Sequence, residues 1–405
     1  MAGCETFDDY HDGDKPVEKV EAVPLDEQPR LDPINRNYFI LEDPEQSVIG
    51  ELQIVFTNED DTFSDLAREY GLGYDELVAA NPSIDPWLPG ENTPIVLPTQ
   101  YVVPEGPRSG IVLNIAAKRL FYFPEVPEGQ SPVVMTYPIG IGRVGWETPL
   151  GETTVISKAR DPVWYVPASV RKEHAEAGDP LPSVVQPGPD NPLGNRVLKL
   201  DIPGYLIHGT NQPYGVGMRV SHGCVRLYPE NIELLYDLVE IGEDVRIVNE
   251  PYLVGYKDGD IYFEGHEILE DDTLSADDRF AAMFEAHEEL EDETYQQAVQ
   301  GIAGEARGIP VRLASVKEKE AFATARIVRN TVEHDPEEPT LDEVRAMMDE
   351  EEAPEASAEA ATPSEVAAEA PAEETAEPAE EPQIVIPYAP GVVPDELEGE
   401  PVVSN

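Results

Sequence analysis

Tyr-Leu-Ile-His-Gly-Thr-Asn-Gln-Pro-Tyr-Gly-Val-Gly-Met-Arg-Val-Ser-His-Gly-Cys-Val-Arg-Leu-Tyr, residues 205–228, is the stretch on which the interpretation of this chain depends. It contains two of the seven histidines and one of the two cysteines. Five glycines or prolines separate His208 from Cys224, which is too many for a helix or a central strand. An apolar run precedes His208 and a helical pattern follows Cys224. The stretch is therefore predicted to be a strand, a long loop that carries the cysteine, and a helix, and such loops often carry the chemistry.

Charge is unevenly distributed over the 405 residues. Residues 101–250 hold 13 basic and 18 acidic side chains, whereas residues 251–405 hold 9 and 41. The length predicts two or three folded units. The acidity argues against nucleic acid as a partner, because phosphates attract Lys and Arg, and against docking on an anionic membrane.

The N-terminal residues predict a tether rather than a folded unit. Residues 1–35 are polar and rich in Asp, Glu and Pro, which predicts disorder. We expect no intact signal peptide, since the N-terminus lacks a basic region followed by an apolar core. We also expect no transmembrane segment, since no apolar run of about 18 residues exists. Met1-Ala2-Gly3-Cys4 resembles a bacterial lipoprotein processing box, which implies lipidation of Cys4. The alternative is a chance tetrapeptide, and a disulfide between Cys4 and Cys224 is not expected.

Residues 36–100 show a strand–helix–helix–strand pattern. The strands are expected at 52–56 and 94–98, and the helices at 63–70 and 74–81, the first with a capping-box-like start at Thr62 and Asp65 and the second ending before Pro82. The order, with Ala-Ala-Asn-Pro closing the second helix, resembles a LysM domain. This resemblance implies a small α+β domain that binds peptidoglycan glycan. The alternative is an α+β spacer.

Residues 101–250 read as many short strands separated by turns, which predicts a mainly β sandwich. A hairpin is expected at 111–123, followed by strands at 133–137, 153–158, 198–200, 206–207 and 245–248 and a helix at 231–238. The glycine-rich loop 140–151 lacks the spacing of a phosphate-binding P-loop, and no helix follows it.

The C-terminal third is predicted to be mostly acidic and disordered. Residues 251–300 are expected to form a hairpin around 257–259 and one acidic helix over 276–298. Residues 301–405 are expected to be an acidic low-complexity tail, since the Ala/Glu/Pro/Thr tract at 354–382 has almost nothing to bury.

Cys224 is the candidate nucleophile of this chain. A thiolate needs a base or a cation nearby, and the candidates are His208, His222 and Arg226. The N–H groups around Gly223 and Cys224, ahead of the helix, are candidates for an oxyanion hole. Three alternatives compete: a zinc site, which lacks a fourth ligand, two satisfied core histidines, or an inert thiol.

The motif itself resembles one enzyme family. His208-Gly209-Thr210 followed by Ser221-His222-Gly223-Cys224-Val225-Arg226-Leu227 resembles the signature of the L,D-transpeptidases, the YkuD or ErfK/YbiS/YcfS/YnhG family. The resemblance extends over about residues 108–250 and includes Gly140–Arg143, Thr148–Gly151, Pro162–Pro167 and Asn191–Gly194. It implies a β-sandwich catalytic domain.

The resemblance also implies roles for individual residues. Cys224 would be the nucleophile, His208 its base, and the carbonyl of Gly209 the group that orients His208. His222 and Gly223 would shape the oxyanion site. Substrate contacts are assigned to Arg226, which would hold a carboxylate or support the thiolate, and to Ser221, Trp164 and Asn211.

The implied reaction joins a diaminopimelate of a peptidoglycan tetrapeptide stem to an acceptor amine and releases D-Ala. The acceptor would be another stem peptide, a lysine of an outer-membrane lipoprotein or a free D-amino acid. No cofactor and no metal is implied, and the location would be the periplasm or cell envelope, with lipid anchoring through Cys4. The alternatives are a hydrolase on the same fold and a wall-binding spacer protein.

Overall fold

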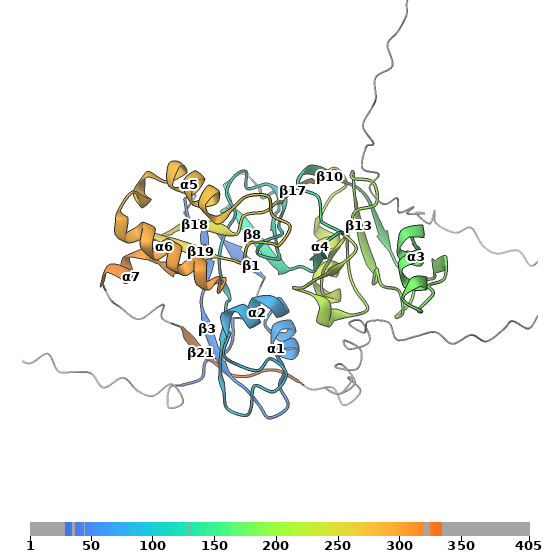
Figure 1. Ribbon diagram of the computed structural model, residues 1–405, viewed down its shortest axis with the longest axis horizontal. Coiled ribbons are helices and arrows are strands. Elements are labelled where there is room, and N and C mark those ends of the chain that lie inside the picture. The colour runs from blue at the N-terminus through green and yellow to red at the C-terminus, as the bar shows by residue number, and fades with distance from the viewer. Residues whose placement is uncertain (1–28, 35–36, 44, 128, 319–324, 334–405) are drawn as a thin grey trace, which may run out of the picture.

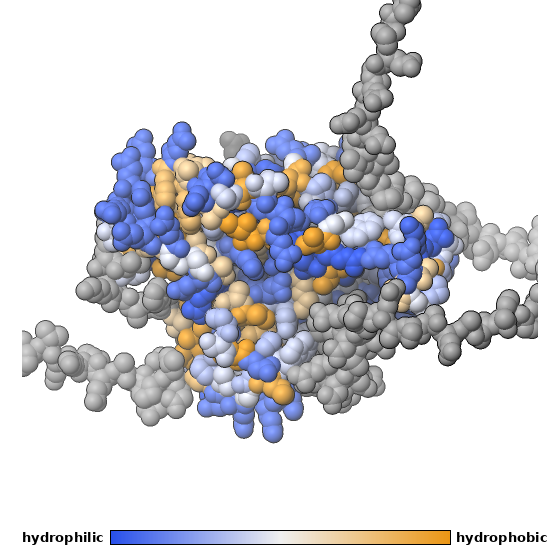
Figure 2. Space-filling model, in the orientation of Figure 1, coloured by the Kyte–Doolittle hydropathy of each residue, from blue (hydrophilic) through white to orange (hydrophobic). Residues whose placement is uncertain are grey.

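The computed structural model describes residues 29–34, 37–43, 45–127, 129–318 and 325–333. Cys4, most of the predicted tether and the predicted tail from residue 334 onwards lie outside these ranges. Within the described ranges, no helix combines the length and the apolar character needed to cross a membrane. On the face shown in Figure 2, hydrophilic residues predominate and hydrophobic residues occur in small groups.

A nine-stranded sheet forms the centre of the molecule (Figure 1), which confirms the mainly β prediction. From one edge to the other its strands are β1 (Tyr38–Ile40), β8 (Val133–Pro138), β7 (Arg119–Phe123), β6 (Gly110–Asn114), β17 (Asp244–Val248), β10 (Gly151–Arg160), β13 (Arg196–Leu200), β14 (Leu206–His208) and β16 (Val225–Arg226). The expected hairpin is β6 and β7, paired antiparallel with Leu113 opposite Leu120. The sheet is mixed, because β6 and β17 run parallel, as do β14 and β16.

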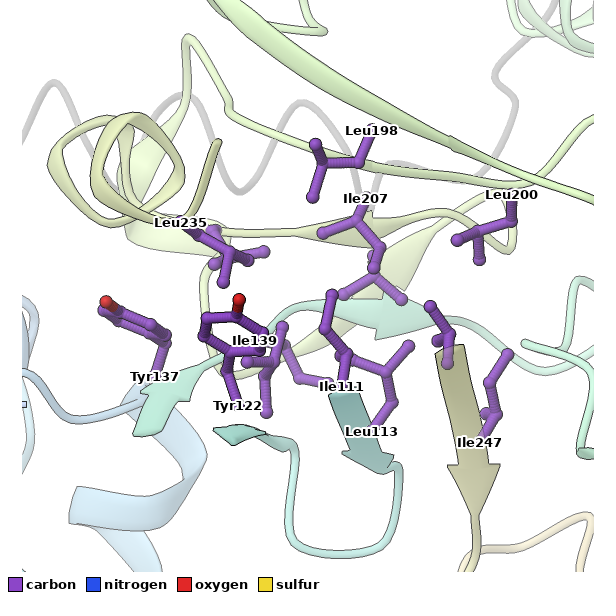
Figure 3. Packing of buried hydrophobic residues seen from close by; sticks show 14 of the residues in the cluster. Ile111, Leu113, Tyr122, Tyr137, Ile139, Leu198, Leu200, Ile207, Leu235 and Ile247 are labelled. Carbon is purple, nitrogen blue, oxygen red and sulfur yellow. The ribbon is translucent and has the colours of Figure 1, made fainter. Parts of the chain in front are cut away.

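The sheet curls around helix α4 (Pro229–Leu238), whose Ile232 and Leu235 are buried. Strands alternate their side chains between two faces, so that Ile111 and Leu113 of β6 point inward while Val112 points outward. The inward residues of β6, β7 and β8 meet those of β13 and β14 and Leu235 of α4 in one core (Figure 3). This core holds the edge of the sheet at which residues 205–228 lie.

The N-terminal unit covers the outer face of β6, β7 and β8. It has the expected strand–helix–helix–strand order, β3 (Gln53–Phe56), α1 (Phe63–Glu69), α2 (Tyr74–Ala80) and β4 (Pro94–Leu97), with β2 (Val48–Gly50) paired to β5 (Gln100–Val102). The capping box of Thr62 and Asp65 is present at the start of α1. Phe63, Leu66 and Leu77 share one hydrophobic cluster with Val112 and Phe121 of the central sheet.

The C-terminal module packs beside the central sheet (Figure 1). Its elements are β18 (Tyr252–Lys257), β19 (Asp260–Gly265), α5 (Ala276–Ala286), the 3-10 helix η3 (Glu288–Leu290), α6 (Glu293–Glu305), β20 (Val311–Arg312) and α7 (Leu313–Glu318). Strands β18 and β19 form the hairpin expected around 257–259. The chain then returns to the N-terminal unit, where β21 (Arg326–Val328) pairs parallel with β3.

Four expectations differ from the structure, each because a long-range contact decides it. The single helix expected over 276–298 is two helices, since the chain bends at η3 to bury Leu290. The tail expected from residue 301 begins later, because α6 continues to Glu305 and β20, α7 and β21 pack on folded units. Residues 29–34 of the expected tether contact β21 through Leu31. Strand β1, expected with the N-terminal unit, pairs with β8 of the central sheet.

Short elements complete the surroundings of residues 205–228. They are β9 (Ile141–Gly142), β11 (Trp164–Tyr165), α3 (Ala168–Glu176), β12 (Val184–Val185), the 3-10 helix η2 (Pro213–Gly215) and β15 (Arg219–Ser221). Strand β15 pairs with β9, and β11 pairs with β12. Helix α3 is not predicted by the sequence, because only one of its nine residues, Val170, is buried and its hydrophobic periodicity is correspondingly weak.

Candidate active site

The register of β14 and β16 brings the predicted base and nucleophile to one face of the sheet edge. His208 lies opposite Arg226 in this parallel pair, and Cys224 precedes Arg226 by two residues. Because side chains alternate between faces, His208, Arg226 and Cys224 share the outer face. Ile207 and Val225 between them point into the core. The core thus fixes the strands while the opposite face presents the reactive groups.

His208 is a buried neutral imidazole held in one tautomer. Its Nδ1 lies 2.6 Å from the carbonyl oxygen of Gly209, which can only accept, so Nδ1 carries the proton and the lone pair of the neutral ring is on Nε2. Burial, together with the charge of Arg226, lowers the pKa of His208 to about 3, although the carbonyls of Gly209 and Leu193 act in the opposite direction. At neutral pH the side chain is therefore ready to accept a proton.

Cys224 lies in an apolar surrounding. It packs against a cluster formed by Leu193, Val197 and Leu206 together with Trp164, and its Sγ lies 3.7 Å from the carbonyl oxygen of Gly204. Burial raises the pKa of the Cys224 thiol to about 11, while the backbone of Leu206 and the charge of Arg226 act to lower it. The resting pair is thus a thiol and a neutral imidazole, so proton transfer has to accompany attack on a substrate.

The backbone before Cys224 is shaped by two hydroxyl groups. Ser221 Oγ donates to the carbonyl of Cys224 (2.5 Å) and accepts from the N–H of Gly223 (3.2 Å). Thr148 Oγ1 donates to the carbonyl of Gly223 (2.9 Å) and accepts from the N–H of Gly142 (3.2 Å). Ser221 is buried and its hydroxyl is used in the loop, which differs from the substrate contact assigned to it from the sequence.

Gly223 has a backbone conformation that residues with a side chain rarely adopt. Its φ is +99°, and a Cβ there would lie 2.9 Å from Cε1 of Tyr205. Since its N–H already bonds to Ser221, the N–H of Cys224 is the remaining candidate of the two expected oxyanion donors.

His222 lies in a polar cluster that the sequence does not reveal. Its Nε2 is 3.2 Å from Oε2 of Glu173 on α3 and 3.1 Å from Nη2 of Arg143, and Arg143 also contacts Glu173. The ring of Trp146 meets His222 edge to face at 5.0 Å. Burial and the charge of Arg143 lower the pKa of His222 to about 4, while Glu173 opposes this shift.

The remaining expected residues are more scattered. Trp164 packs against the same cluster of apolar residues as Cys224, and its strand β11 pairs with β12, which lies in the Pro- and Gly-rich loop 178–195. Buried Asn191 ties this loop to the carbonyl of Pro162 (2.7 Å). Asn211 is exposed and lines a shallow surface cavity with Asp161, Asn195 and Pro229. Within the described ranges, no group of three or more His, Cys, Asp or Glu residues is placed to hold a metal ion.

Three residues of the site were not assigned roles from the sequence. Thr148 and Arg143 come from the glycine-rich loop 140–151, whose composition marks it only as a shaped loop. Glu173 comes from α3, where no local pattern distinguishes it from the other exposed acids. The arrangement as a whole supplies a thiol, a base with its lone pair on Nε2 and a tightly shaped loop, which is what nucleophilic acyl transfer requires.

The sequence matches the YkuD family, the L,D-transpeptidase catalytic domain, over residues 108–247. It is 39% identical to the probable L,D-transpeptidase YcfS of Escherichia coli K12 over 227 residues, which are 55% of this chain and 70% of that protein. Against the probable L,D-transpeptidase YbiS of the same strain it is 39% identical over 226 residues, 55% of this chain and 72% of that protein. The probable L,D-transpeptidase ErfK/SrfK of Salmonella typhimurium is 39% identical over 214 residues, 52% of this chain and 68% of that protein. The chain therefore belongs to the L,D-transpeptidase family of enzymes.

Proposed function

We propose that this protein is a peptidoglycan L,D-transpeptidase that works through an acyl-enzyme on Cys224. The observation that carries the proposal is the placement of His208 and Cys224 on one face of the β14–β16 edge, with Nδ1 of His208 occupied by the carbonyl of Gly209. This leaves Nε2 as the acceptor for the thiol proton. A backbone carbonyl takes the orienting part that a carboxylate has in a Ser-His-Asp triad.

In the first step the thiol of Cys224 attacks the carbonyl of the diaminopimelate that precedes the terminal D-Ala of a tetrapeptide stem. Nε2 of His208 takes the thiol proton, and the N–H of Cys224 donates to the developing oxyanion. The intermediate collapses to a thioester, and His208 passes its proton to the leaving amine of D-Ala.

In the second step an acceptor amine attacks the thioester. His208 removes a proton from this amine and returns it to the departing thiolate, so that enzyme and base end in their starting states. An amine of another stem gives a wall cross-link, a lysine of an outer-membrane lipoprotein gives anchoring, and a free D-amino acid gives exchange.

Mass spectrometry of the protein mixed with a tetrapeptide stem or a carbapenem tests the first step. A covalent adduct is expected on the wild-type protein and on Cys4→Ser, which removes the other thiol, and none is expected on Cys224→Ala. An adduct that persists in Cys224→Ala would exclude this mechanism. Cross-linked products distinguish a transpeptidase from a hydrolase, which would release a free tripeptide stem.

We also propose that the protein acts in the cell envelope, with lipidation at Cys4 and with residues 36–100 as a LysM-like glycan-binding unit. The support for the latter is the strand–helix–helix–strand order of β3, α1, α2 and β4. Metabolic acyl labelling of the wild type and of Cys4→Ser tests the anchor. Co-sedimentation with purified glycan strands tests the unit, and no enrichment over a buffer control would refute glycan binding.

A further inference from the structure

Two hydrogen-bond donors converge on one carboxylate beside the catalytic loop. Arg143 Nη2 and His222 Nε2 both contact the carboxylate of Glu173, and the two nitrogens are 3.1 Å apart. A carboxylate only accepts hydrogen bonds, so the tautomer that satisfies Glu173 places the proton of His222 on Nε2. Two N–H groups then point at the same place, which is favourable only while an anion occupies it.

This point lies close to the reacting groups. The N–H of Arg143 donates to the carbonyl of Ser221 (3.0 Å), and His222 is two residues before Cys224. The Cα of Gly223 would be 3.0 Å from a Cβ on Gly142, so the two loops touch at this position. A group bound to Arg143 and His222 is therefore beside the loop that holds the nucleophile.

Glu173 reaches this point from an element that is weakly attached. Of the nine residues of α3, only Val170 is buried, and Figure 1 shows the helix at one end of the molecule, beyond the sheet. The side chains of Arg143 and Glu173 are 38% and 39% exposed. Elements with few buried apolar contacts open at low free-energy cost, so Glu173 can leave while Arg143 and His222 stay in place.

We propose that Arg143 and His222 form a carboxylate-binding site that Glu173 fills in the resting enzyme, and that the terminal carboxylate of a stem peptide replaces Glu173 on binding. This inference rests on the proposed function, since it names the group that the same active site recognises. One carboxylate replaces another, so the charge of the site is unchanged. It assigns substrate recognition to Arg143 in place of Arg226, which lies against Gly140 and whose charge acts on His208 and Cys224.

The test compares two ligands that differ only at the proposed contact: a tetrapeptide stem ending in D-Ala, and the same peptide with a terminal carboxamide. Binding is measured by calorimetry on Cys224→Ala, so that no turnover is needed. We expect the carboxylate form to bind roughly tenfold more tightly than the amide, as for a hydrogen bond to a charged group. Adding Arg143→Gln should remove this preference.

Glu173→Gln in the same background should strengthen binding of the carboxylate form several-fold and leave the amide form unchanged. Glu176→Gln is the matched control, because Glu176 lies on the same helix but pairs with Lys172 at the surface (3.7 Å). A loss of α3 packing alone would weaken both peptides equally. Thermal melts of each variant confirm that it is folded.

Equal binding of the two peptides to Cys224→Ala would overturn the inference, and so would a preference that survives Arg143→Gln. These outcomes are independent of the proposed function, which depends on acyl-enzyme formation by the wild type. A wild type that forms no adduct, combined with a preference that Arg143→Gln abolishes, would support the carboxylate site and refute the transpeptidase mechanism. An adduct on the wild type without any preference for the carboxylate peptide would support the transpeptidase mechanism and refute the carboxylate site.

Discussion

The catalytic loop is supported on two sides, and the two supports differ in burial. On one side the N-terminal unit meets residues 217–228 and β7 along what we call the seam, formed by Leu72, Gly73 and Glu76 against Gly217, Tyr228 and Arg119. Tyr228 Oη donates to the carbonyl of Leu72 (3.1 Å), and Arg119 Nη2 pairs with Glu76 at 2.6 Å with both side chains buried. On the other side α3 contacts His222 of the loop through the half-exposed Glu173 (3.2 Å) and through the ring of His174, 6.2 Å from the ring of His222.

This difference indicates that the two supports around Cys224 have different roles, one rigid and one exchangeable. The seam leaves no space for adjustment, since a Cβ on Gly217 would lie 2.3 Å from the Cα of Gly73. The α3 side consists of polar contacts that water or a ligand can replace. The N-terminal unit therefore fixes the loop, whereas α3 can exchange its contact for a substrate, and the hydrophobic core that the unit shares with β6, β7 and β8 makes it part of the catalytic fold.

The largest expected effect comes from breaking the buried ion pair of the seam. Arg119→Ala would leave the carboxylate of Glu76 buried without its partner and would also remove the guanidinium that stacks 4.0 Å from the ring of Tyr101. Such losses cost about 3–5 kcal/mol. Urea denaturation should show this decrease in the free energy of unfolding.

The matched control is Arg160→Ala, because Arg160 and Asp237 form a pair that is 60% and 66% exposed. We expect a change of at most about 1 kcal/mol there. The double variant Arg119→Met with Glu76→Leu should recover most of the stability, since both charges are removed together. A loss below about 1 kcal/mol for Arg119→Ala would contradict the rigid role of the seam.

The next effect concerns Cys224, which lies between the two supports. With burial raising its pKa from 9.0 to about 11, the thiolate at pH 7 should be roughly 100-fold scarcer than for an ordinary cysteine. The test is the rate at which iodoacetamide alkylates the Cys4→Ser variant, measured by mass spectrometry. This rate should increase about tenfold per pH unit up to pH 9 without a plateau.

Arg226→Gln provides the control for this measurement. The charge of Arg226 lowers the thiol pKa, so its removal should raise the pKa further and slow alkylation at every pH below it. A plateau near pH 6–7 would instead reveal a thiolate–imidazolium pair with His208. In that case the neutral resting state described above would be wrong.

The parts of this structure that the sequence predicts are those that depend on local patterns. The motif around His208 and Cys224, the hairpin of β6 and β7 and the order of β3, α1, α2 and β4 are local patterns, and each was found. The pairing of β14 with β16, which places the proposed base and nucleophile on one face of the sheet, follows from the spacing of the motif only through the family resemblance.

The contacts that join distant segments were not predictable in this way. Glu173 is 49 residues from His222, Glu76 is 43 residues from Arg119, and β21 is far along the chain from β3. Nothing in the composition of an acidic chain distinguishes these carboxylates from the others. Their partners are set by tertiary packing, which overrides local propensity.

A smaller effect is expected from crowding the seam at one backbone contact. Gly217→Ala places a methyl group against the backbone of Gly73, which cannot move aside as a side chain could. Gly178, at the end of α3, has nearly the same φ (+86° against +89°) but open space around it. The loss in the free energy of unfolding of Gly178→Ala therefore measures the cost of the backbone conformation alone. Subtracting it from the loss in Gly217→Ala gives the cost of the clash with Gly73.

We expect the difference between the two variants to be about 1–3 kcal/mol, as for overpacking. The rate of acyl-enzyme formation should decrease in Gly217→Ala and remain near the wild-type value in Gly178→Ala, because Gly217 lies in the seam that fixes the loop and Gly178 has open space around it. Equal losses of stability in the two variants would show that the close approach of Gly73 and Gly217 is relaxed at little cost.

The smallest effect is expected at the exposed rim of the seam. Arg68 pairs with Glu230 at 3.2 Å and bridges α1 to α4, but these side chains are 40% and 49% exposed. Water and salt screen such a pair, so Arg68→Ala should cost only about 0.2–1 kcal/mol, and less at high ionic strength. Urea denaturation at low and high salt measures this directly. Because Arg68 and Arg119 bridge the same two units, a large loss at Arg68 that becomes smaller at high salt would show that charge pairing rather than burial holds the seam. The expected order, with Arg119 far above Arg68, follows from burial: without Arg119 the buried carboxylate of Glu76 keeps only the N–H of Gly73 (3.0 Å) and no cation, whereas Glu230 returns to water.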